Sequence, residues 1–374
     1  MSGTRLLGIE AESKVEGESK AVRFVKIHWR KGIPSVALTT SSLVICLLVI
    51  EVACRIFGLL PPPSRTFQFS PTKGYELVAG HGDINSHGLR DREYSVAKQL
   101  GTFRIIAIGD SFTYGSGVAQ GETYAKRLEA ILNERLRNGS TYFEVLNAGV
   151  PGYNTNQELI HLREVGLQFA PDLILVGFTL SDAELGSFGL KDVRSGRWLI
   201  GVKEWAKRHF ALYAFLTLRV KRLFDLFESL ISGGDVGQIG GSAVIPLRLA
   251  AKGKASPGWD LCRQSLQGIA DIASSRNIPV MLAIFPLLID LDDSYPFKAE
   301  HVLITRVGRE NQMIAVDLLP AFVGLEPSSL WVKPTDSHPN ARGHSIAAEA
   351  IYRGMLSHAL VPLTVPPASN ASTH

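Results

Sequence analysis

The stretch "FRIIAIGDSFTYG" (residues 103–115) decides the class of fold. Its first seven residues are apolar apart from Arg104, and the chain then turns to Gly-Asp-Ser. A short apolar run that ends in a turn signal predicts a strand buried on both faces of a sheet. The polar residues that follow would then lie at the carboxyl end of that strand.

Similar apolar runs recur along the chain and alternate with amphipathic segments. Continuous apolar strands separated by helices predict an α/β fold, a five-stranded parallel sheet covered on both faces. Such sheets bind ligands at the carboxyl ends of their strands. The other expected strands are 142–149, 173–178, 278–285 and 314–319. The expected helices are 124–136, 155–168, 258–276, 298–311 and 340–357.

Composition and charge argue against a nucleic-acid-binding protein and against a disulfide-stabilised one. The chain has 374 residues, of which 45% are hydrophobic, and a net charge of +4. Residues 1–31 hold seven Lys or Arg against four Glu, so +3 of that charge lies there. The remainder is almost neutral, which argues against a nucleic-acid partner. Three cysteines are too few for a disulfide framework, and we expect all three to be free.

The segment "GIPSVALTTSSLVICLLVI" (32–50) carries no charge over 19 residues. As a helix it would be about 28 Å long, which matches a bilayer core. A buried core helix and a cleaved signal peptide are the alternatives. A core helix seldom has so long a charge-free run, and a signal peptide has a short basic region before its apolar run. We therefore predict an uncleaved, single-pass transmembrane anchor at 32–60.

The basic residues before this segment predict its orientation. By the positive-inside rule, residues 1–31 form a cytoplasmic tail, and the chain after the anchor lies outside. In a Gram-negative cell this means an inner-membrane protein with its larger, C-terminal part in the periplasm. An extended lead-in (61–100) and the α/β domain (101–360) would follow, with a disordered tail at 361–374. Residues 186–257 interrupt the strand–helix rhythm, and we expect a helical insertion there, a membrane-surface helix being the alternative.

Ser111 directly follows the first strand of the α/β domain. At or near the amino end of the next helix, free backbone N–H groups and the helix dipole would favour an oxyanion. Position 113 is Thr, so the Gly-x-Ser-x-Gly elbow of α/β-hydrolases is excluded. Taken alone, the motif fits a nucleophile or a capping serine equally.

Two later segments supply partners for such a serine. The second strand ends in "NAGVPGYNTNQE" (147–158), where Gly149 could bring its backbone N–H close to a developing negative charge. Near the C-terminus, "TDSHPNARGH" places Asp336 two residues before His338. A histidine held by a carboxylate can take a proton from serine. Ser111, a glycine loop and an Asp/His pair would meet at one edge of the sheet.

The blocks "GDSFTYG", "NAGVPGYNT" and "DSHPNARGH" together resemble, in order, those of the SGNH (GDSL-type) hydrolases. The lead-in "INSHGLRDREY" (84–94) and the anchor's "EVACRIFG" resemble membrane-anchored members. The resemblance covers about 84–185 and 258–357. It implies a three-layer α/β/α, flavodoxin-like fold and an esterase or acyl transferase without metal or organic cofactor.

By this resemblance Ser111 is the nucleophile, His338 the general base and then acid, and Asp336 the residue that orients the imidazole. The backbone N–H groups of Ser111 and Gly149 would bind the oxyanion.

A third donor in the family is the Asn of an Asn-Asp pair, and here that position is Ser181. A hydroxyl is a shorter donor than an amide, and the substitutes that the sequence offers are Asn154 and Asn156. The acid also departs from the common Asp-x-x-His spacing, with Thr335 in the usual position.

The function expected from these features is a membrane-anchored, extracytoplasmic serine esterase. Its partners would be an acyl ester, such as an acylated glycan or lipid, and the bilayer around residues 32–60. An O-acyltransferase acting on a cell-surface glycan is one alternative, because water and a sugar hydroxyl compete for the same acyl-enzyme. A non-catalytic assembly or binding subunit with a degenerate site is the other, and Ser181 is the feature that favours it.

Overall fold

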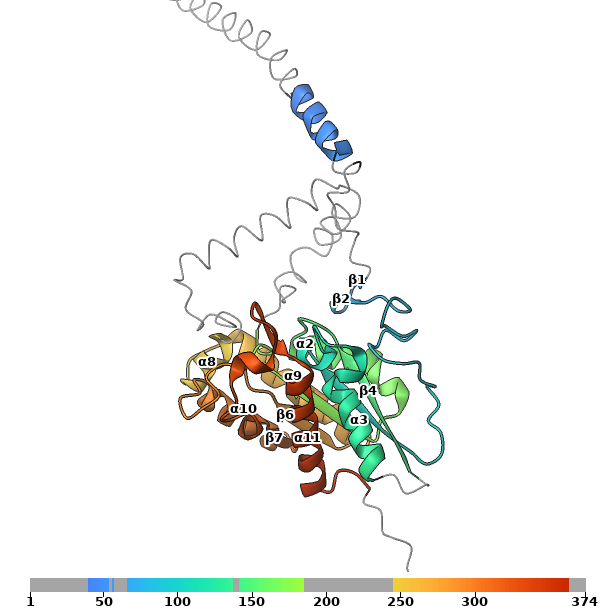
Figure 1. Ribbon diagram of the computed structural model, residues 1–374, viewed down its shortest axis with the longest axis vertical. Coiled ribbons are helices and arrows are strands. Elements are labelled where there is room, and N and C mark those ends of the chain that lie inside the picture. The colour runs from blue at the N-terminus through green and yellow to red at the C-terminus, as the bar shows by residue number, and fades with distance from the viewer. Residues whose placement is uncertain (1–39, 54–55, 57–65, 137–140, 185–244, 363–374) are drawn as a thin grey trace, which may run out of the picture. The chain divides into compact units, whose positions relative to one another are not determined.

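A computed structural model describes residues 40–53, 56, 66–136, 141–184 and 245–362 (Figure 1). The chain divides into a smaller unit (1–63 and 202–228) and a larger unit with the remaining residues. The predicted basic tail, about half of the anchor, most of the insertion and nearly all of the C-terminal tail lie outside the described residues.

The described part of the smaller unit is mainly one helical stretch, at 40–53. Its large apolar side chains are exposed, from Leu47 at 44% to Val49 at 62%. Among the residues with described structure, no helix has the combination of length and apolar character that a bilayer crossing requires.

The larger unit is built on the five-stranded parallel sheet that the sequence predicts. Its strand order is β4-β3-β5-β6-β7. The first strand, β3, is therefore internal, the second, β4, forms one edge, and the remaining strands follow on the other side of β3 up to the opposite edge, β7. This is the flavodoxin-like order, and its topological switch point lies between β3 and β5. The strands are β3 (Thr102–Gly109), β4 (Tyr142–Gly149), β5 (Leu173–Phe178), β6 (Val280–Ile284) and β7 (Ile314–Asp317).

Helices cover both faces of this sheet, as two neighbouring residues of β6 demonstrate. Met281 and Leu282 point to opposite faces, because successive strand residues do. Met281 meets Gly354 of α11, whereas Leu282 meets Gly308 of α10. On the first face α11 packs beside α3, and Figure 1 shows the two together in front of the sheet. On the second face α4 packs on α9 and α10 on α8. These helices are α3 (Tyr124–Arg135), α4 (Thr155–Glu164), α8 (Ile245–Ala251), α9 (Pro257–Ser274), α10 (Lys298–Glu310) and α11 (Ala341–Ser357).

Two antiparallel hairpins lie outside the main sheet. The lead-in, expected to be extended, contains the first, in which β1 (Phe67–Ser70) pairs with β2 (Gly74–Leu77). The second joins β8 (Trp331–Lys333) to β9 (Asp336–Pro339). Both use strands of three or four residues, which are too short to show the apolar alternation by which strands are recognised in a sequence.

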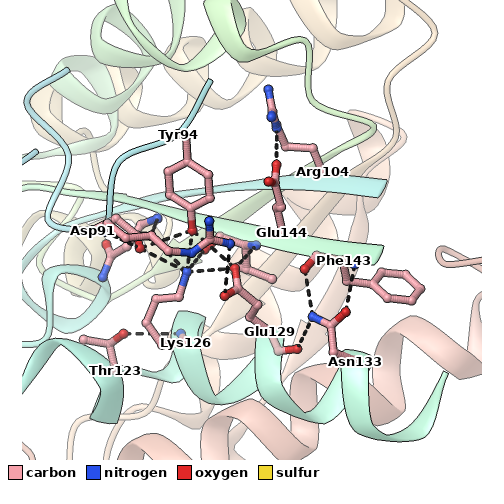
Figure 2. A network of polar contacts seen from close by, with 12 residues as sticks. Asp91, Tyr94, Arg104, Thr123, Lys126, Glu129, Asn133, Phe143 and Glu144 are labelled. Atoms are coloured by element: carbon pink, nitrogen blue, oxygen red, sulfur yellow. Dashed lines mark hydrogen bonds and ion pairs between the residues drawn. The ribbon is translucent and has the colours of Figure 1, made fainter. Parts of the chain in front are cut away.

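The edge strand β4 has its outward-facing backbone groups bound by side chains of α3 (Figure 2). Asn133 accepts from the Phe143 N–H at 3.0 Å and donates to the Phe143 carbonyl at 2.8 Å. Glu129 Oε2 accepts from the Val145 N–H, and Lys126 Nζ donates to the Val145 carbonyl, both at 2.8 Å. The helix thus satisfies backbone groups that a neighbouring strand would otherwise pair.

A buried charge cluster completes this edge. Asp91 Oδ2 accepts from the Asn147 N–H at 2.9 Å and lies 3.1 Å from Lys126 Nζ. Lys126 also donates to Glu129 at 2.8 Å and to the Tyr94 hydroxyl at 2.6 Å. The lead-in residues Asp91 and Tyr94 are thereby tied to both α3 and β4 (Figure 2).

Candidate active site

Ser111 is the first residue of α2 (Ser111–Tyr114), a single turn that follows β3 directly. Asp110 caps this turn, because its side chain accepts from the Phe112 N–H at 2.8 Å. Gly109 is required just before it, since a Cβ there would overlap Thr113 Oγ1 and lie 2.7 Å from the Gly177 carbonyl oxygen. Ser111 therefore occupies the amino end of a helical turn, where its own N–H has no intrahelical acceptor.

The structure brings Ser111, His338 and Asp336 together, although Asp336 lies 225 positions after Ser111 in the sequence. The Ser111 hydroxyl oxygen lies 2.9 Å from His338 Nε2, and His338 Nδ1 lies 2.6 Å from Asp336 Oδ1. Strand β9 carries both partners, so that their side chains, two residues apart, point the same way. The ring of Phe112 packs edge-on against the His338 ring.

The electrostatics of this group fit a histidine held by a carboxylate. Partial burial raises the pKa of Asp336, but hydrogen bonds from the ring and backbone of His338 lower it more, so its pKa lies below the ordinary value. Asp336 is therefore ionised at neutral pH and accepts the Nδ1 proton. The remaining nitrogen, Nε2, faces the Ser111 hydroxyl and can accept its proton.

Gly149, predicted as an oxyanion donor, uses its N–H elsewhere. That N–H donates to the Asn147 side-chain oxygen at 3.0 Å. A Cβ at Gly149 would collide with the backbone of Thr113 and Tyr114. The glycine at this position therefore lets the end of β4 pack closely on α2.

The loop after β4 leaves a different N–H available. The Val150 N–H donates to the Gly109 carbonyl, and the Tyr153 N–H donates to the Val150 carbonyl. Pro151 has no N–H. Within 149–153, all of which the structure describes, Gly152 is thus the residue whose N–H has no recorded acceptor. The Pro-Gly pair in "GVPGYN" is a turn signal, but it does not reveal which N–H is free.

Ser181, the position where the family has an amide, points into a buried polar cluster. Thr179 Oγ1 lies 2.7 Å from Ser181 Oγ, 3.0 Å from Asp110 Oδ2 and 2.9 Å from Asp182 Oδ1. A hydroxyl carries one proton, and Thr179 gives its proton to a carboxylate oxygen. The Ser181 hydroxyl therefore donates to Thr179 or to Asp110, with which it also forms a hydrogen bond.

Burial raises the pKa of Asp110. Burial also raises the pKa of Asp182, and the nearby charges of Glu158 and Asp110 raise it further. Both carboxyls are nearly inaccessible to solvent. We assign them to holding the loops that follow β3 and β5.

The proposed amide substitutes are also accounted for. Asn154 is the N-cap of α4, where its side chain accepts from the Gln157 N–H at 3.0 Å and donates to the Glu184 carbonyl at 3.0 Å. One of its two amide N–H groups and its side-chain oxygen are therefore engaged in holding the start of α4 and the loop after β5. Asn156 is the second residue of α4 and is half-buried.

Arg90 is a residue of the lead-in that the sequence did not single out. It is 6% exposed. Its guanidinium donates to the carbonyls of Tyr114, Gly115 and Val118 at 2.7–2.8 Å. These are the carbonyls at and beyond the carboxyl end of the α2 turn, so Arg90 caps the turn that carries the serine.

His344 is a structural residue, as its place on the last helix suggests. It is fully buried, and its Nδ1 accepts from the Tyr124 N–H at 3.2 Å. Burial lowers the pKa of His344 to about 4. Within the described ranges, no three His, Cys, Asp or Glu side chains are arranged to hold a metal ion.

Comparison with known proteins connects this geometry to a family. The model of the GDSL-like lipase/acylhydrolase family matches residues 107–346. No curated protein matches the chain. Solved structures that resemble it include Axe2, an acetylxylan esterase from Geobacillus stearothermophilus, at 16% identity and a TM-score of 0.41, covering 69% of this chain and 96% of that one. TesA matches at 15% identity and a TM-score of 0.41, covering 69% of this chain and 99% of its own.

Proposed function

The chain belongs to the GDSL-like lipase/acylhydrolase family and is a carboxylic ester hydrolase, and we propose that it cleaves acyl esters through an acyl-serine intermediate. The observation that carries the proposal is the hydrogen-bonded series from Ser111 through His338 to Asp336. The three residues are the proposed nucleophile, general base and orienting acid.

In the first half of the reaction His338 Nε2 takes the Ser111 hydroxyl proton while Oγ attacks the acyl carbonyl carbon. Asp336 accepts the Nδ1 proton and stabilises the imidazolium. His338 then gives its proton to the leaving alcohol oxygen, and the acyl group stays on Ser111. In the second half His338 takes a proton from the water that attacks the acyl carbonyl carbon. It then gives this proton to Ser111 Oγ as the bond between Oγ and the acyl carbon breaks, which releases the carboxylic acid and restores the free enzyme.

The oxyanion of the tetrahedral intermediate needs donors that are free and close. The Ser111 N–H qualifies because it stands at the amino end of α2. For the second donor we propose the Gly152 N–H in place of that of Gly149, whose N–H is engaged with Asn147. Ser181 is not part of this proposed oxyanion hole, because its hydroxyl donates within the cluster around Thr179.

Labelling with a fluorophosphonate probe tests the nucleophile. The wild type should be labelled, and Ser111→Ala should not. Ser116→Ala is the matched control, a serine in the turn just beyond α2, and it should be labelled like the wild type. A folded wild type that resists the probe would refute the proposal and favour a non-catalytic binding role.

Water is the acyl acceptor in this proposal, and product analysis tests it. With an acyl ester and an excess of a glycan acceptor, the expected product is the free carboxylic acid. Accumulation of acylated glycan would identify a transferase. No feature of the described site favours transfer over hydrolysis.

We further propose that the enzyme is anchored in the inner membrane with its catalytic domain on the periplasmic side. The proposal is supported by the charge-free run at 32–50, the basic residues before it and the exposed apolar side chains at 40–53. Alkaline phosphatase fused after residue 100 should be active in a Gram-negative host, whereas a fusion after residue 31 should not. Activity of the second fusion would contradict this orientation.

A further inference from the structure

The loop that carries the proposed second oxyanion donor is a tight turn of defined type. The Tyr153 N–H donates to the Val150 carbonyl, which closes a four-residue turn with Pro151 and Gly152 at its centre. Gly152 has a φ of +76°. Proline cannot adopt positive φ, so this is a type II turn, with Pro and Gly in their preferred positions.

Type I and type II turns differ in the orientation of their central peptide. Here that peptide joins the Pro151 carbonyl to the Gly152 N–H. The chain has no cis peptide bond among its described residues, so this carbonyl and this N–H point in opposite directions. A flip of the peptide to the type I form would reverse both, and the Gly152 N–H would turn away from the site.

One side chain holds this peptide from outside the loop. The Tyr75 hydroxyl, from β2 of the N-terminal hairpin, donates to the Pro151 carbonyl at 2.8 Å. The same hydroxyl oxygen would lie 2.9 Å from a Cβ at Gly152. Burial raises the pKa of the Tyr75 phenol, and the charge of Asp110 raises it further, so the hydroxyl stays protonated and the bond persists at high pH.

We infer that Tyr75 is a positioning residue for catalysis: by holding the Pro151 carbonyl, it keeps the turn in its type II form and directs the Gly152 N–H at the substrate oxyanion. The inference rests on the proposed esterase function. A hydrogen bond to the carbonyl also polarises the peptide, which makes its N–H a better donor.

The hairpin around Tyr75 is built to keep this hydroxyl in place. The Tyr153 hydroxyl donates to the Tyr75 carbonyl at 2.6 Å, and the two rings meet edge to face with centroids 5.2 Å apart. Phe67 of β1 packs on the other side of the pair, with its ring centroid 5.6 Å from that of Tyr75. Tyr75 lies outside residues 107–346, so the part of the chain that matches the family model would lack this contact on its own.

Tyr75→Phe tests the inference in the full chain, because it removes the hydroxyl and keeps the packed ring. We expect kcat for a short-chain p-nitrophenyl ester to fall about three- to tenfold, the effect of one hydrogen bond, with KM changed less than about twofold. Affinity for a trifluoromethyl ketone, whose serine adduct carries an oxyanion, should fall by the same factor as kcat. The matched control is Tyr352→Phe, which removes a phenol hydroxyl of α11 that contacts Arg135 of α3 and leaves the turn and the hairpin untouched.

Three outcomes are informative. Parallel loss of kcat and ketone affinity in Tyr75→Phe, with Tyr352→Phe within about twofold of wild type, supports the inference. Equal losses in both variants, or a rise in KM alone in Tyr75→Phe, would overturn it. A wild type that neither hydrolyses the ester nor reacts with a fluorophosphonate would overturn the proposed function itself. Melting temperatures of both variants establish that they are folded.

Discussion

Replacing Ser181 by alanine distinguishes two roles for the position where the family has an amide. If Ser181 were an oxyanion donor, its loss would cost about 10²- to 10³-fold in kcat. The structure assigns its proton elsewhere, because the hydroxyl lies 2.7 Å from Thr179 Oγ1 and also hydrogen-bonds Asp110. We therefore expect Ser181→Ala to retain kcat within about tenfold of the wild type.

The cost should appear in stability. A hydroxyl in a neutral hydrogen bond contributes about 0.5–1.5 kcal/mol net, and one whose acceptor is ionised contributes about 1.5–3 kcal/mol. Thr179 keeps its own carboxylate acceptors, so the lower range applies to Ser181→Ala. For a domain of this size, about 1 kcal/mol corresponds to a melting temperature lower by about 2–4 °C.

The assay is hydrolysis of p-nitrophenyl acetate under saturating conditions, together with thermal unfolding followed by circular dichroism. Ser116→Ala serves as the matched serine control, and Ser111→Ala sets the background rate. A hundredfold loss of kcat in Ser181→Ala with an unchanged melting temperature would refute the hydrogen-bond assignment. It would show that the Ser181 hydroxyl turns toward the oxyanion during the reaction.

Three further predictions concern the framework of the site. Lys126→Met leaves Asp91 buried without its cation, so the free energy of unfolding in urea should fall by about 3–5 kcal/mol, and a loss below about 1 kcal/mol would contradict this. A lysine at position 90 cannot reach all three carbonyls that Arg90 binds, so for Arg90→Lys we expect the free energy of unfolding to fall by about 3 kcal/mol and fluorophosphonate labelling to slow. His344 has a folded-state pKa of about 4, below its unfolded value, so its neutral form stabilises the fold above about pH 6.5 and this contribution is lost as pH falls toward 4. His344→Gln should therefore lose less stability than the wild type between pH 7 and pH 5, and equal losses would argue against a buried neutral His344.

The parallel sheet could be predicted from the sequence because the central parts of β3, β5 and β6 are covered on both faces and are apolar without interruption. The core residues of β5, for instance, are fully buried without interruption. The β1–β2 hairpin could not be predicted in the same way. Its strands have four residues each, and most of their side chains are partly exposed, so no apolar period marks them.

The candidate site was predicted as far as residue types and spacing reach. Ser111 follows the end of β3, where a parallel sheet binds its ligands, and the Asp-x-His spacing marked Asp336 and His338 as its partners. That these two residues lie on β9, a short strand outside the parallel sheet, was not predicted. Their catalytic roles remain a prediction that the labelling experiment tests. The oxyanion donor was harder to predict, because whether Gly149 or Gly152 offers its N–H depends on the Asn147 side chain, a contact that no local pattern encodes.

The side chains that cover β4 have a consequence for how the protein behaves among its own copies. An open edge strand is a template for sheet extension, in which a second chain adds a strand and aggregation follows. Here Asn133, Glu129, Lys126 and Asp91 already occupy the outward backbone groups of alternate residues from Phe143 to Asn147. An incoming strand would have to displace a buried ion pair as well as a helix. We therefore expect the assembled domain to resist edge-to-edge association at β4, and α3 to act as a built-in blocker of sheet growth.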